Sequence, residues 1–314
     1  MKKYVPDYYD KFLCTADKCQ HSCCIGWEID IDDDTLEYYK TVGGSLGQRL
    51  CENIVTEEDG TSHFKLCSDE RCPFLNDKNL CDIYTELGAD GFCQICDDHP
   101  RFRNFYSDRE EIGLGLCCEA AGKLILTNPQ PSQLVCTEDD GSELLWEEEC
   151  DFLDFRDDVF DILQNRSKHI FRRIEDMLKY CEAEAVIKTA AQWAKIYLSL
   201  EQLDNNWGVL LCELQKAEEG QLSLQKTEES ELAFEQLAVY FAFRHLADGL
   251  DDDRLCERAK FVDLSCKMIY WLCTLQYSKT GALTIDDIVE IARMYSSEIE
   301  YNDDNIDALL NVLA

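Results

Sequence analysis

Cysteines are concentrated in the first half of this chain, in spacings that suit metal binding. Of the 19 cysteines among 314 residues, 14 lie before residue 151. The first cluster reads Cys14-x4-Cys19-x3-Cys23-Cys24, which places four thiols within eleven residues. Zinc and iron–sulfur clusters each need about four thiolate or imidazole ligands that converge on one centre. The spacing therefore predicts a metal-binding segment.

A second cluster lies between residues 72 and 96. The loop Cys93-x2-Cys96 can place two sulfurs on one ion with little cost in chain closure. The more distant Cys72 and Cys81 would then attach this loop to another segment, so that metal binding contributes directly to folding. We expect roughly the first 120 residues to be a scaffold that folds around metal. A third group, the adjacent pair at 117–118, ends the run.

The cysteine pattern does not choose between metals. Two structural zinc sites, one [4Fe-4S] cluster, or one of each would fit the number of thiols. Adjacent thiols such as Cys23-Cys24 do not easily bind the same small ion, so one is expected to ligate while the other packs. For Cys117-Cys118 core packing is favoured. Isolated cysteines elsewhere are also expected to be plain core residues, namely Cys136, Cys181, Cys212, Cys256, Cys266 and Cys273.

The segment after the second cluster offers further candidates. His99 could be a ligand, a donor that orients a thiolate, or a helix-terminal residue. Arg101 and Arg103 are cations in an acidic chain, and they could offset the charge of a thiolate cluster or bind a carboxylate of a cofactor. The alternative for both arginines is ion pairing with Asp97 or Asp98.

The composition and net charge of the chain indicate which kinds of molecule it could bind. With 46% hydrophobic and 11% aromatic residues the chain can form a core, and its net charge is −34. Such a surface repels nucleic-acid phosphates and anionic membranes, whereas it attracts a lysine-rich protein or a cationic cofactor. The alternative is that these acidic surface residues only keep the protein soluble. The start has no apolar run like a signal peptide, and no segment approaches about 18 consecutive apolar residues. We therefore expect a cytoplasmic protein without membrane insertion, whose thiols are reduced.

The elements expected to position the cysteines are short. Residues 4–13 are expected to form an irregular lead-in, and residues 27–32 alternate apolar and acidic residues like a strand with one buried face. Asp33 or Asp34 could cap a helix that ends near residue 40. The further elements expected here are a helix at 46–53, a hairpin within 55–70, a helix at 83–87, an extended segment at 102–106 and a helix from about 118 to 127.

From residue 145 onward the pattern is helical. The polar stretch 128–143 predicts a boundary, which gives a cysteine-rich domain at 1–130, a linker at 131–144 and a helical domain at 145–314. Thr284 is the expected cap of one helix. Helices are expected at 184–200, 203–217, 229–249, 253–277, 284–296 and 303–313. The predicted class is α+β, mostly α, with short strands and helices in the cysteine-rich domain followed by a helical bundle.

Several common cofactor signatures are absent from the sequence. No Gly-x-Gly-x-x-Gly follows a strand, and neither a phosphate-binding loop nor Gly-x-Ser-x-Gly occurs. The spacing Cys-x3-Cys-x2-Cys, typical of radical enzymes that use S-adenosylmethionine, is not met either, since Cys24 follows Cys23 directly.

Six blocks within residues 1–125 resemble the flagellin lysine-N-methylase family, which is itself similar to the CxxCxxCC group of zinc- or iron-chelating proteins. The blocks are Tyr4-Val5-Pro6-Asp7-Tyr8-Tyr9, the run from Cys14 to Trp27, Cys72-Pro73-Phe74-Leu75, Cys81-Asp82-Ile83, the run from Cys93 to Phe102, and Gly113-Leu114-Gly115-Leu116-Cys117-Cys118. Residues 145–314 resemble only a generic helical region.

The resemblance implies a protein-lysine N-methyltransferase that acts on flagellin, with S-adenosylmethionine as donor and a [4Fe-4S] cluster, or alternatively zinc, as metal centre. It assigns no catalytic base. The metal-ligand candidates that it carries over are Cys14, Cys19, Cys23, Cys24, Cys72, Cys81, Cys93 and Cys96. The rival interpretation is a non-catalytic zinc- or iron-binding protein whose acidic helical domain docks a partner, and a third is an electron-transfer or metal-delivery protein.

Overall fold

The computed structural model describes residues 1–68, 70–141, 145–218, 224 and 227–314. Helices account for 56% of the residues and strands for 11%, which confirms the mostly helical α+β class. The chain forms two compact units: unit 1 comprises residues 1–12 and 102–314, and unit 2 comprises residues 13–101. In the part of the chain that is described, no helix has both the length and the apolar character needed to cross a membrane.

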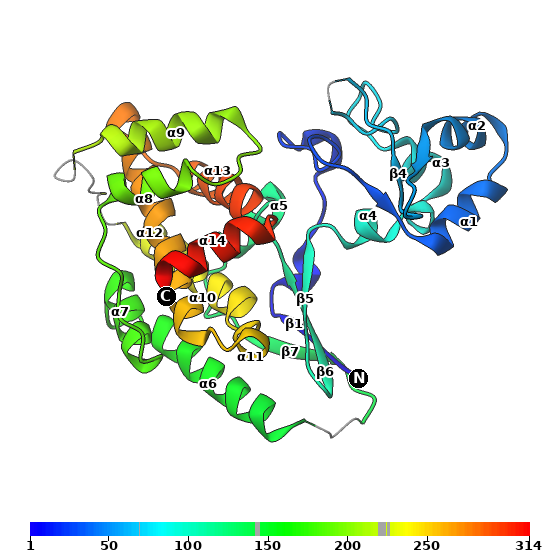
Figure 1. Cartoon of the computed structure of the whole chain (residues 1–314). Helices are drawn as coiled ribbons and strands as arrows, with labels where there is room; N and C mark the ends of the chain where they lie inside the picture. The colour runs from blue at the N-terminus through cyan, green and yellow to red at the C-terminus, as the bar shows by residue number, and fades with distance from the viewer. Residues whose placement is uncertain (69, 142–144, 219–223, 225–226) are drawn as a thin grey trace. The chain divides into compact units, whose positions relative to one another are not determined.

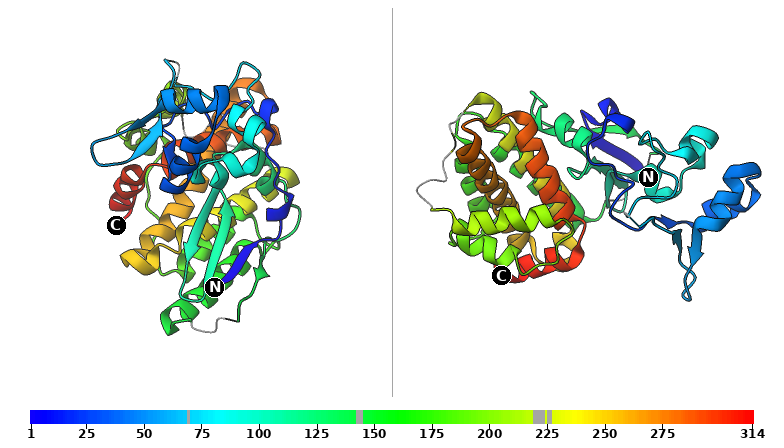
Figure 2. Two further views of the ribbon diagram at one scale, coloured as in Figure 1. Left: turned by 90° about the vertical axis from the view of Figure 1, so that its right-hand side faces the viewer. Right: turned by 90° about the horizontal axis from the view of Figure 1, so that it is seen from above.

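Unit 1 contains a four-stranded sheet with the order β5-β6-β1-β7. Strand β1 pairs in parallel with β6 and antiparallel with β7, and β1, β5 and β6 lie side by side in Figures 1 and 2. The strands are β1 (Lys2–Pro6), β5 (Arg101–Phe105), β6 (Arg109–Leu114) and β7 (Leu134–Glu138).

The helices of unit 1 surround two long central ones, α10 and α12. Helix α10 packs against α5, α6, α7, α12 and α13, and it is buried nearly all round, as a central helix must be. The helices are α5 (Glu119–Leu126), α6 (Glu147–Leu163), α7 (Ile170–Tyr180), α8 (Ala190–Tyr197), α9 (Asn205–Lys216), α10 (Glu228–His245), α11 (Gly249–Asp252), α12 (Leu255–Thr280), α13 (Ile285–Tyr295) and α14 (Asp303–Leu313), with a 3-10 turn η1 (Tyr9–Lys11) and a π-helix η5 (Ser296–Glu300).

Unit 2 is built from short elements around a three-stranded sheet of order β2-β4-β3. Its core contains the aromatic side chains of Tyr39, Phe64 and Phe74. The elements are η2 (Ala16–Lys18), β2 (Asp30–Ile31), α1 (Asp33–Thr41), α2 (Gly44–Asn53), β3 (Ile54–Thr56), β4 (Ser62–Phe64), α3 (Asp82–Leu87), η3 (Ala89–Gly91) and α4 (Gln94–Asp98). The hairpin expected within 55–70 is therefore present, as β3 and β4.

Two helix caps lie at or next to the residues predicted from the sequence. Thr284 caps α13, because its hydroxyl accepts a hydrogen bond from Asp287 N while the Asp287 carboxylate accepts from Thr284 N. At α1 the cap is Asp32, one residue before the expected Asp33 or Asp34, and its carboxylate accepts from Thr35 N at 2.9 Å.

Two expectations for irregular segments were wrong. The lead-in at 4–13 begins inside β1, and the polar stretch 128–143 contains β7. Both strands are paired with residues far away in the chain, for example Tyr4 with Glu111 and with Cys136, so their local composition carries little strand signal. Residues 142–144 of the expected linker lie outside the described residues.

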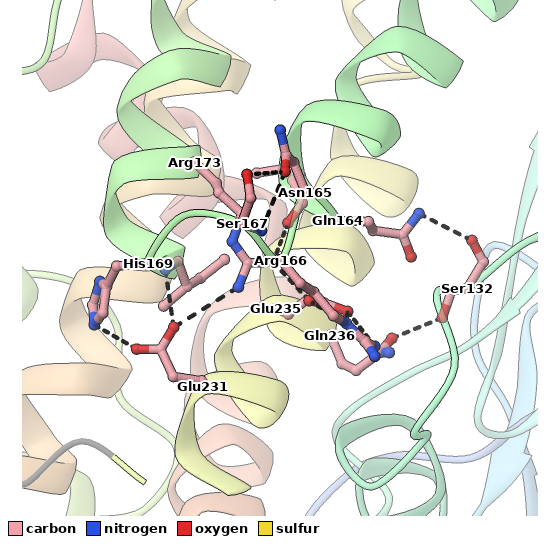
Figure 3. Close-up of polar contacts among 12 residues, drawn as sticks. Ser132, Gln164, Asn165, Arg166, Ser167, His169, Arg173, Glu231, Glu235 and Gln236 are labelled. Carbon is pink, nitrogen blue, oxygen red and sulfur yellow. Dashed lines mark hydrogen bonds and ion pairs between the residues drawn. The ribbon is translucent and has the colours of Figure 1, made fainter. Parts of the chain in front are cut away.

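Because β1 pairs with β6 and β7, the N-terminus and residues 102–141 belong to the same compact unit as the helices. The boundaries of the compact units fall at 12/13 and 101/102, whereas composition placed a linker at 131–144. Gln236 on α10 contributes to this arrangement, since its amide donates to the carbonyls of Asn128 and Gln130. Its side-chain oxygen accepts a hydrogen bond from Ser132 (Figure 3).

A buried carboxylate joins α7 and α10. Glu235 is 1% exposed, and it accepts from Arg173 Nη1 at 2.6 Å and from Arg166 Nη2 at 2.8 Å (Figure 3). Arg173 is itself 3% exposed. Since a buried charge without a partner is costly, these groups have to remain paired in the folded chain.

We predict that Glu235→Ala lowers the free energy of unfolding by about 3–5 kcal/mol, because it leaves Arg173 buried without its closest carboxylate. Urea unfolding followed by circular dichroism measures this. Glu175→Ala, which removes the exposed partner of Arg172, is the matched control and should have little effect. An equal loss of unfolding free energy in the two variants would contradict the structural role of the buried Glu235–Arg173 pair.

Candidate metal centre

The backbone of unit 2 brings the first cysteine cluster beside Cys72. Cys72 N donates to the carbonyl of Cys24 at 2.8 Å, and Gly26 N donates to the carbonyl of Glu70 at 3.0 Å. These two bonds flank an isolated antiparallel bridge between Ile25 and Arg71. Gly26 has a φ of +90°, which few other residues adopt, so it allows the chain to turn after Cys24.

A tight loop then places Cys81 next to Cys72. Leu75 N donates to the carbonyl of Cys72 at 3.0 Å, and Asp82 N donates to that of Phe74 at 2.8 Å. Leu75 and Cys81 form a second antiparallel bridge. Cys81 is also the N-cap residue of α3, so the start of that helix fixes its position.

The pair Cys93 and Cys96 is held by helix α4. Cys93 is the N-cap residue, and Cys96 N donates to its carbonyl at 3.0 Å. Gln94 N donates to the Asp32 carboxylate at 2.8 Å, so the same side chain that caps α1 also anchors the start of α4. Two helix starts therefore meet at one aspartate.

Five of the eight predicted ligands belong to, or pack against, the hydrophobic core of unit 2. Cys72 and Cys93 are buried there, and Cys24, Cys81 and Cys96 pack against it. We call these five residues the thiol cluster. Around it lie apolar side chains such as Leu50, Phe64 and Phe74.

The other three candidates are placed differently. Cys14 is exposed, and Cys19 Sγ donates to the carbonyl of His21 at 3.2 Å. Cys23 lies directly before Cys24 and hydrogen-bonds to its sulfur. None of these three is a member of the core that contains the thiol cluster, as far as the described residues of that core show.

The five thiols influence one another electrostatically. The pKa of Cys24 is lowered to about 7 by hydrogen bonds from Cys23 and Ser22 and by the charge of Arg71. Burial, together with negative charge on Cys24, Cys81 and Cys93, raises the pKa of Cys72 to about 12.

Cys93 and Cys96 act on each other most strongly. The hydrogen bond between them lowers the pKa of Cys93 and raises that of Cys96, which burial raises as well. Several thiolates cannot coexist in such an interior without a cation, because burial and mutual repulsion both oppose their charge. A bound metal ion or cluster would remove that opposition, and the chemistry of the donor set fits one.

The residues after Cys96 have partners within the protein. Burial, and then the charge of Arg101, lower the pKa of His99 to about 4, so its imidazole is neutral at pH 7. Arg101 Nη1 donates to the carbonyl of Asp97 at 2.7 Å, and Arg103 Nε lies 2.7 Å from the Glu110 carboxylate. Arg103 is therefore ion-paired with Glu110, which was not among the expected partners, and this contact of Arg101 with Asp97 is made to the backbone carbonyl.

Among the described residues of unit 1, the cysteines form no comparable group. Cys181, Cys266 and Cys273 are buried as expected, but Cys136 and Cys212 are exposed, so the core assignment was wrong for those two. Cys136 lies on β7, which has one partly buried and four exposed residues, and Cys212 lies on the outward face of α9.

Cys117 and Cys118 are half-buried in unit 1. Cys118 packs against the helical core, as expected. The Cys117 thiol hydrogen-bonds to Tyr301, and burial raises its pKa to about 12.

Sequence reasoning missed two polar groups. One is a buried network in unit 1, where Glu300 of the π-helix lies 2.6 Å from His245 Nε2 and accepts from Tyr240 Oη at 3.0 Å. The other, in unit 2, consists of Glu28, Asp30 and His63, whose ligand atoms all lie within 4.8 Å of one another. Each group is completed by a residue far along the chain, His63 in one and Glu300 in the other, so only strand pairing or helix packing could have indicated them.

Fold and site together define a chain with a buried thiol cluster in one compact unit and a mostly helical second unit. Residues 159–314 match the model of a family described as "FliB lysine N-methylase C-terminal domain". With this match and the relatives below, the chain belongs to the flagellin lysine-N-methylase family. No solved structure matches.

Three curated relatives are each 28% identical over 134 residues, which is 41% of this chain. One is the flagellar biosynthetic protein FliU of Salmonella muenchen, of which the match covers 79%. The others are the lysine-N-methylases of Salmonella typhimurium and Salmonella choleraesuis, of which it covers 33%. The match thus spans one third of the length of both named methylases.

We predict that Cys72→Ser and Cys93→Ser each lose most of the bound metal, because each removes a central thiolate of the cluster. Metal per chain is measured by plasma mass spectrometry on anaerobically purified protein. Cys51→Ser and Cys67→Ser alter exposed thiols of the same unit and should keep the metal. Retention in Cys72→Ser and Cys93→Ser, or equal loss in all four variants, would contradict the cluster.

The variant Cys14→Ser tests whether Cys14 is a metal ligand, as the sequence predicted, or lies outside the metal site, as its absence from the thiol cluster indicates. Because Cys14 is exposed, we expect this variant to keep its metal. Metal content per chain is measured in the same way. A loss of metal as large as that of Cys72→Ser would show that Cys14 is a ligand.

Proposed function

We propose that this protein is a protein-lysine N-methyltransferase that acts on flagellin, uses S-adenosylmethionine as methyl donor and holds a metal centre on its thiol cluster. The observation that carries the proposal is the match of residues 159–314 to the lysine N-methylase family. The names of the relatives, a flagellar biosynthetic protein and two lysine-N-methylases, support the substrate class.

The thiol cluster suits the metal centre in number and kind of donor. Five sulfurs are available, and either a [4Fe-4S] cluster or zinc needs about four. The residues that would hold it are Cys24, Cys72, Cys81, Cys93 and Cys96. When bound, an iron–sulfur cluster would supply electron transfer, whereas zinc would supply a structural cross-link.

The charge of the chain suits both reactants. Lysine and the sulfonium of S-adenosylmethionine are cations, and a net charge of −34 favours their approach. Overall the reaction forms a bond between lysine Nζ and the methyl carbon, breaks the bond between that carbon and sulfur, and releases one proton. The amine has to lose that proton before a polar attack, so a carboxylate, a tyrosine or a dry pocket has to lie beside it.

The direct test is an assay with purified, metal-loaded protein, unmethylated flagellin and isotope-labelled S-adenosylmethionine. We expect label on lysine side chains, detected by peptide mass spectrometry. The label should fall together with metal content in Cys72→Ser and persist in Cys51→Ser.

Two outcomes would contradict the proposal. Unmodified lysines with fully loaded protein would exclude methyl transfer to this substrate. If such protein still bound flagellin, the rival interpretation of a non-catalytic metal-binding protein that docks a partner would be favoured.

A further inference from the structure

The face of the three-stranded sheet in unit 2 carries a set of nitrogen and oxygen donors that the thiol cluster does not use. Asp30 on β2 is paired directly with His63 on β4. Glu28 lies two residues before Asp30, and a hydrogen bond from Phe64 N to Ile29 O at 3.1 Å extends the pairing to this point. Since side chains alternate along a strand, Glu28, Asp30 and His63 share one face.

The geometry of the three side chains suits a small cation. One donor atom from each lies within 4.8 Å of the other two. Glu28 Oε1 is 3.4 Å from His63 Nδ1. Ligands of a tetrahedral zinc ion with bonds of about 2.1 Å are roughly 3.4 Å apart, so this separation fits two donors that share one ion.

The burial and hydrogen bonding of the His63 ring give a second, independent indication of a cation site. The residue is only 9% exposed, yet its Nδ1 is buried without a hydrogen-bond partner among the described residues. A protonated imidazole between carboxylates would donate from Nδ1, and buried polar atoms are nearly always satisfied. Within the described part of the chain, His63 Nδ1 makes no hydrogen bond but lies 3.4 Å from the Glu28 carboxylate, so a cation held between these two atoms would satisfy both.

The second ring nitrogen of His63, Nε2, has a carboxylate as its neighbour. Glu57 Oε1 lies 3.9 Å from His63 Nε2. Histidines that bind metal commonly present their second nitrogen to a carboxylate, which favours the tautomer that leaves the first nitrogen free to ligate. Glu57 would act as a positioning residue in this arrangement.

We propose that Glu28, Asp30 and His63 bind a divalent first-row transition-metal ion such as Zn²⁺ or Mn²⁺, at a site separate from the thiol cluster. One imidazole and two carboxylates are ligands that such ions accept, and the remaining positions would be filled by water. The ion would join β2 to β4 and so stabilise a small sheet. The site does not depend on the proposed methyl transfer.

The test uses the full chain, purified without oxygen so that it retains its native metal, dialysed against metal-free buffer and titrated with Mn²⁺ under electron paramagnetic resonance. Mn²⁺ favours oxygen and nitrogen over thiolate, so this probe does not report on the thiol cluster, whether or not metal remains there. We expect one Mn²⁺ per chain, displaced by Zn²⁺. Glu28→Gln and Asp30→Asn should each weaken binding by at least about tenfold.

Both substituted residues are exposed, so these variants should fold. Glu58→Gln changes an exposed carboxylate in the neighbouring hairpin turn and is the matched control, with unchanged affinity expected. Thermal unfolding gives a second readout, because Mn²⁺ should raise the melting temperature of the wild type but not of Glu28→Gln. Absence of saturable binding, or equal affinity in the control and the two variants, would overturn the proposal.

Discussion

The constraint on which unit 2 depends is the burial of several thiols in one small interior. Cys72 and Cys93 occupy core positions beside Phe64 and Phe74, and burial and mutual repulsion oppose charge on the cluster. A unit of short helices and a three-stranded sheet has a limited apolar core of its own. Metal bound by these thiolates would convert an electrostatic penalty into folding energy, as in other small metal-stapled units. The backbone bridges at Ile25–Arg71 and Leu75–Cys81 are then the framework that brings the ligands together.

Unit 1 is stabilised in a different way. Its core is a large set of apolar side chains around α10 and α12, and its buried charges are paired within the protein, as Glu235 with Arg173 and Glu111 with Arg156. The family match at 159–314 falls within this unit. The thiol cluster and the region that matches the family model thus belong to different compact units of the chain. The proposed reaction would require both, since neither alone contains the thiols and the matched helices.

Local signals in the sequence were good predictors where the interactions are local. The Thr284 cap of α13, the helical spacing of α12, α13 and α14, the β3–β4 hairpin and the end of α3 at Leu87 could all be predicted, because capping, turns and helical spacing involve residues close in the chain. Strands β1 and β7 could not, since their partners lie about a hundred residues away. The same limit applies to the site. Spacing indicated that Cys93 and Cys96 act together, but it could not show that Cys14 lies apart from them or that His63 faces Asp30.

The central claim is that the thiol cluster holds metal as part of the native protein. The most direct measurement is the content of iron, zinc and acid-labile sulfide per chain, with the visible spectrum, in full-length protein purified without oxygen. The account predicts about four iron and four sulfide per chain for a [4Fe-4S] centre, or about one zinc at the cluster for the structural alternative. Folded protein with neither iron nor zinc would contradict it.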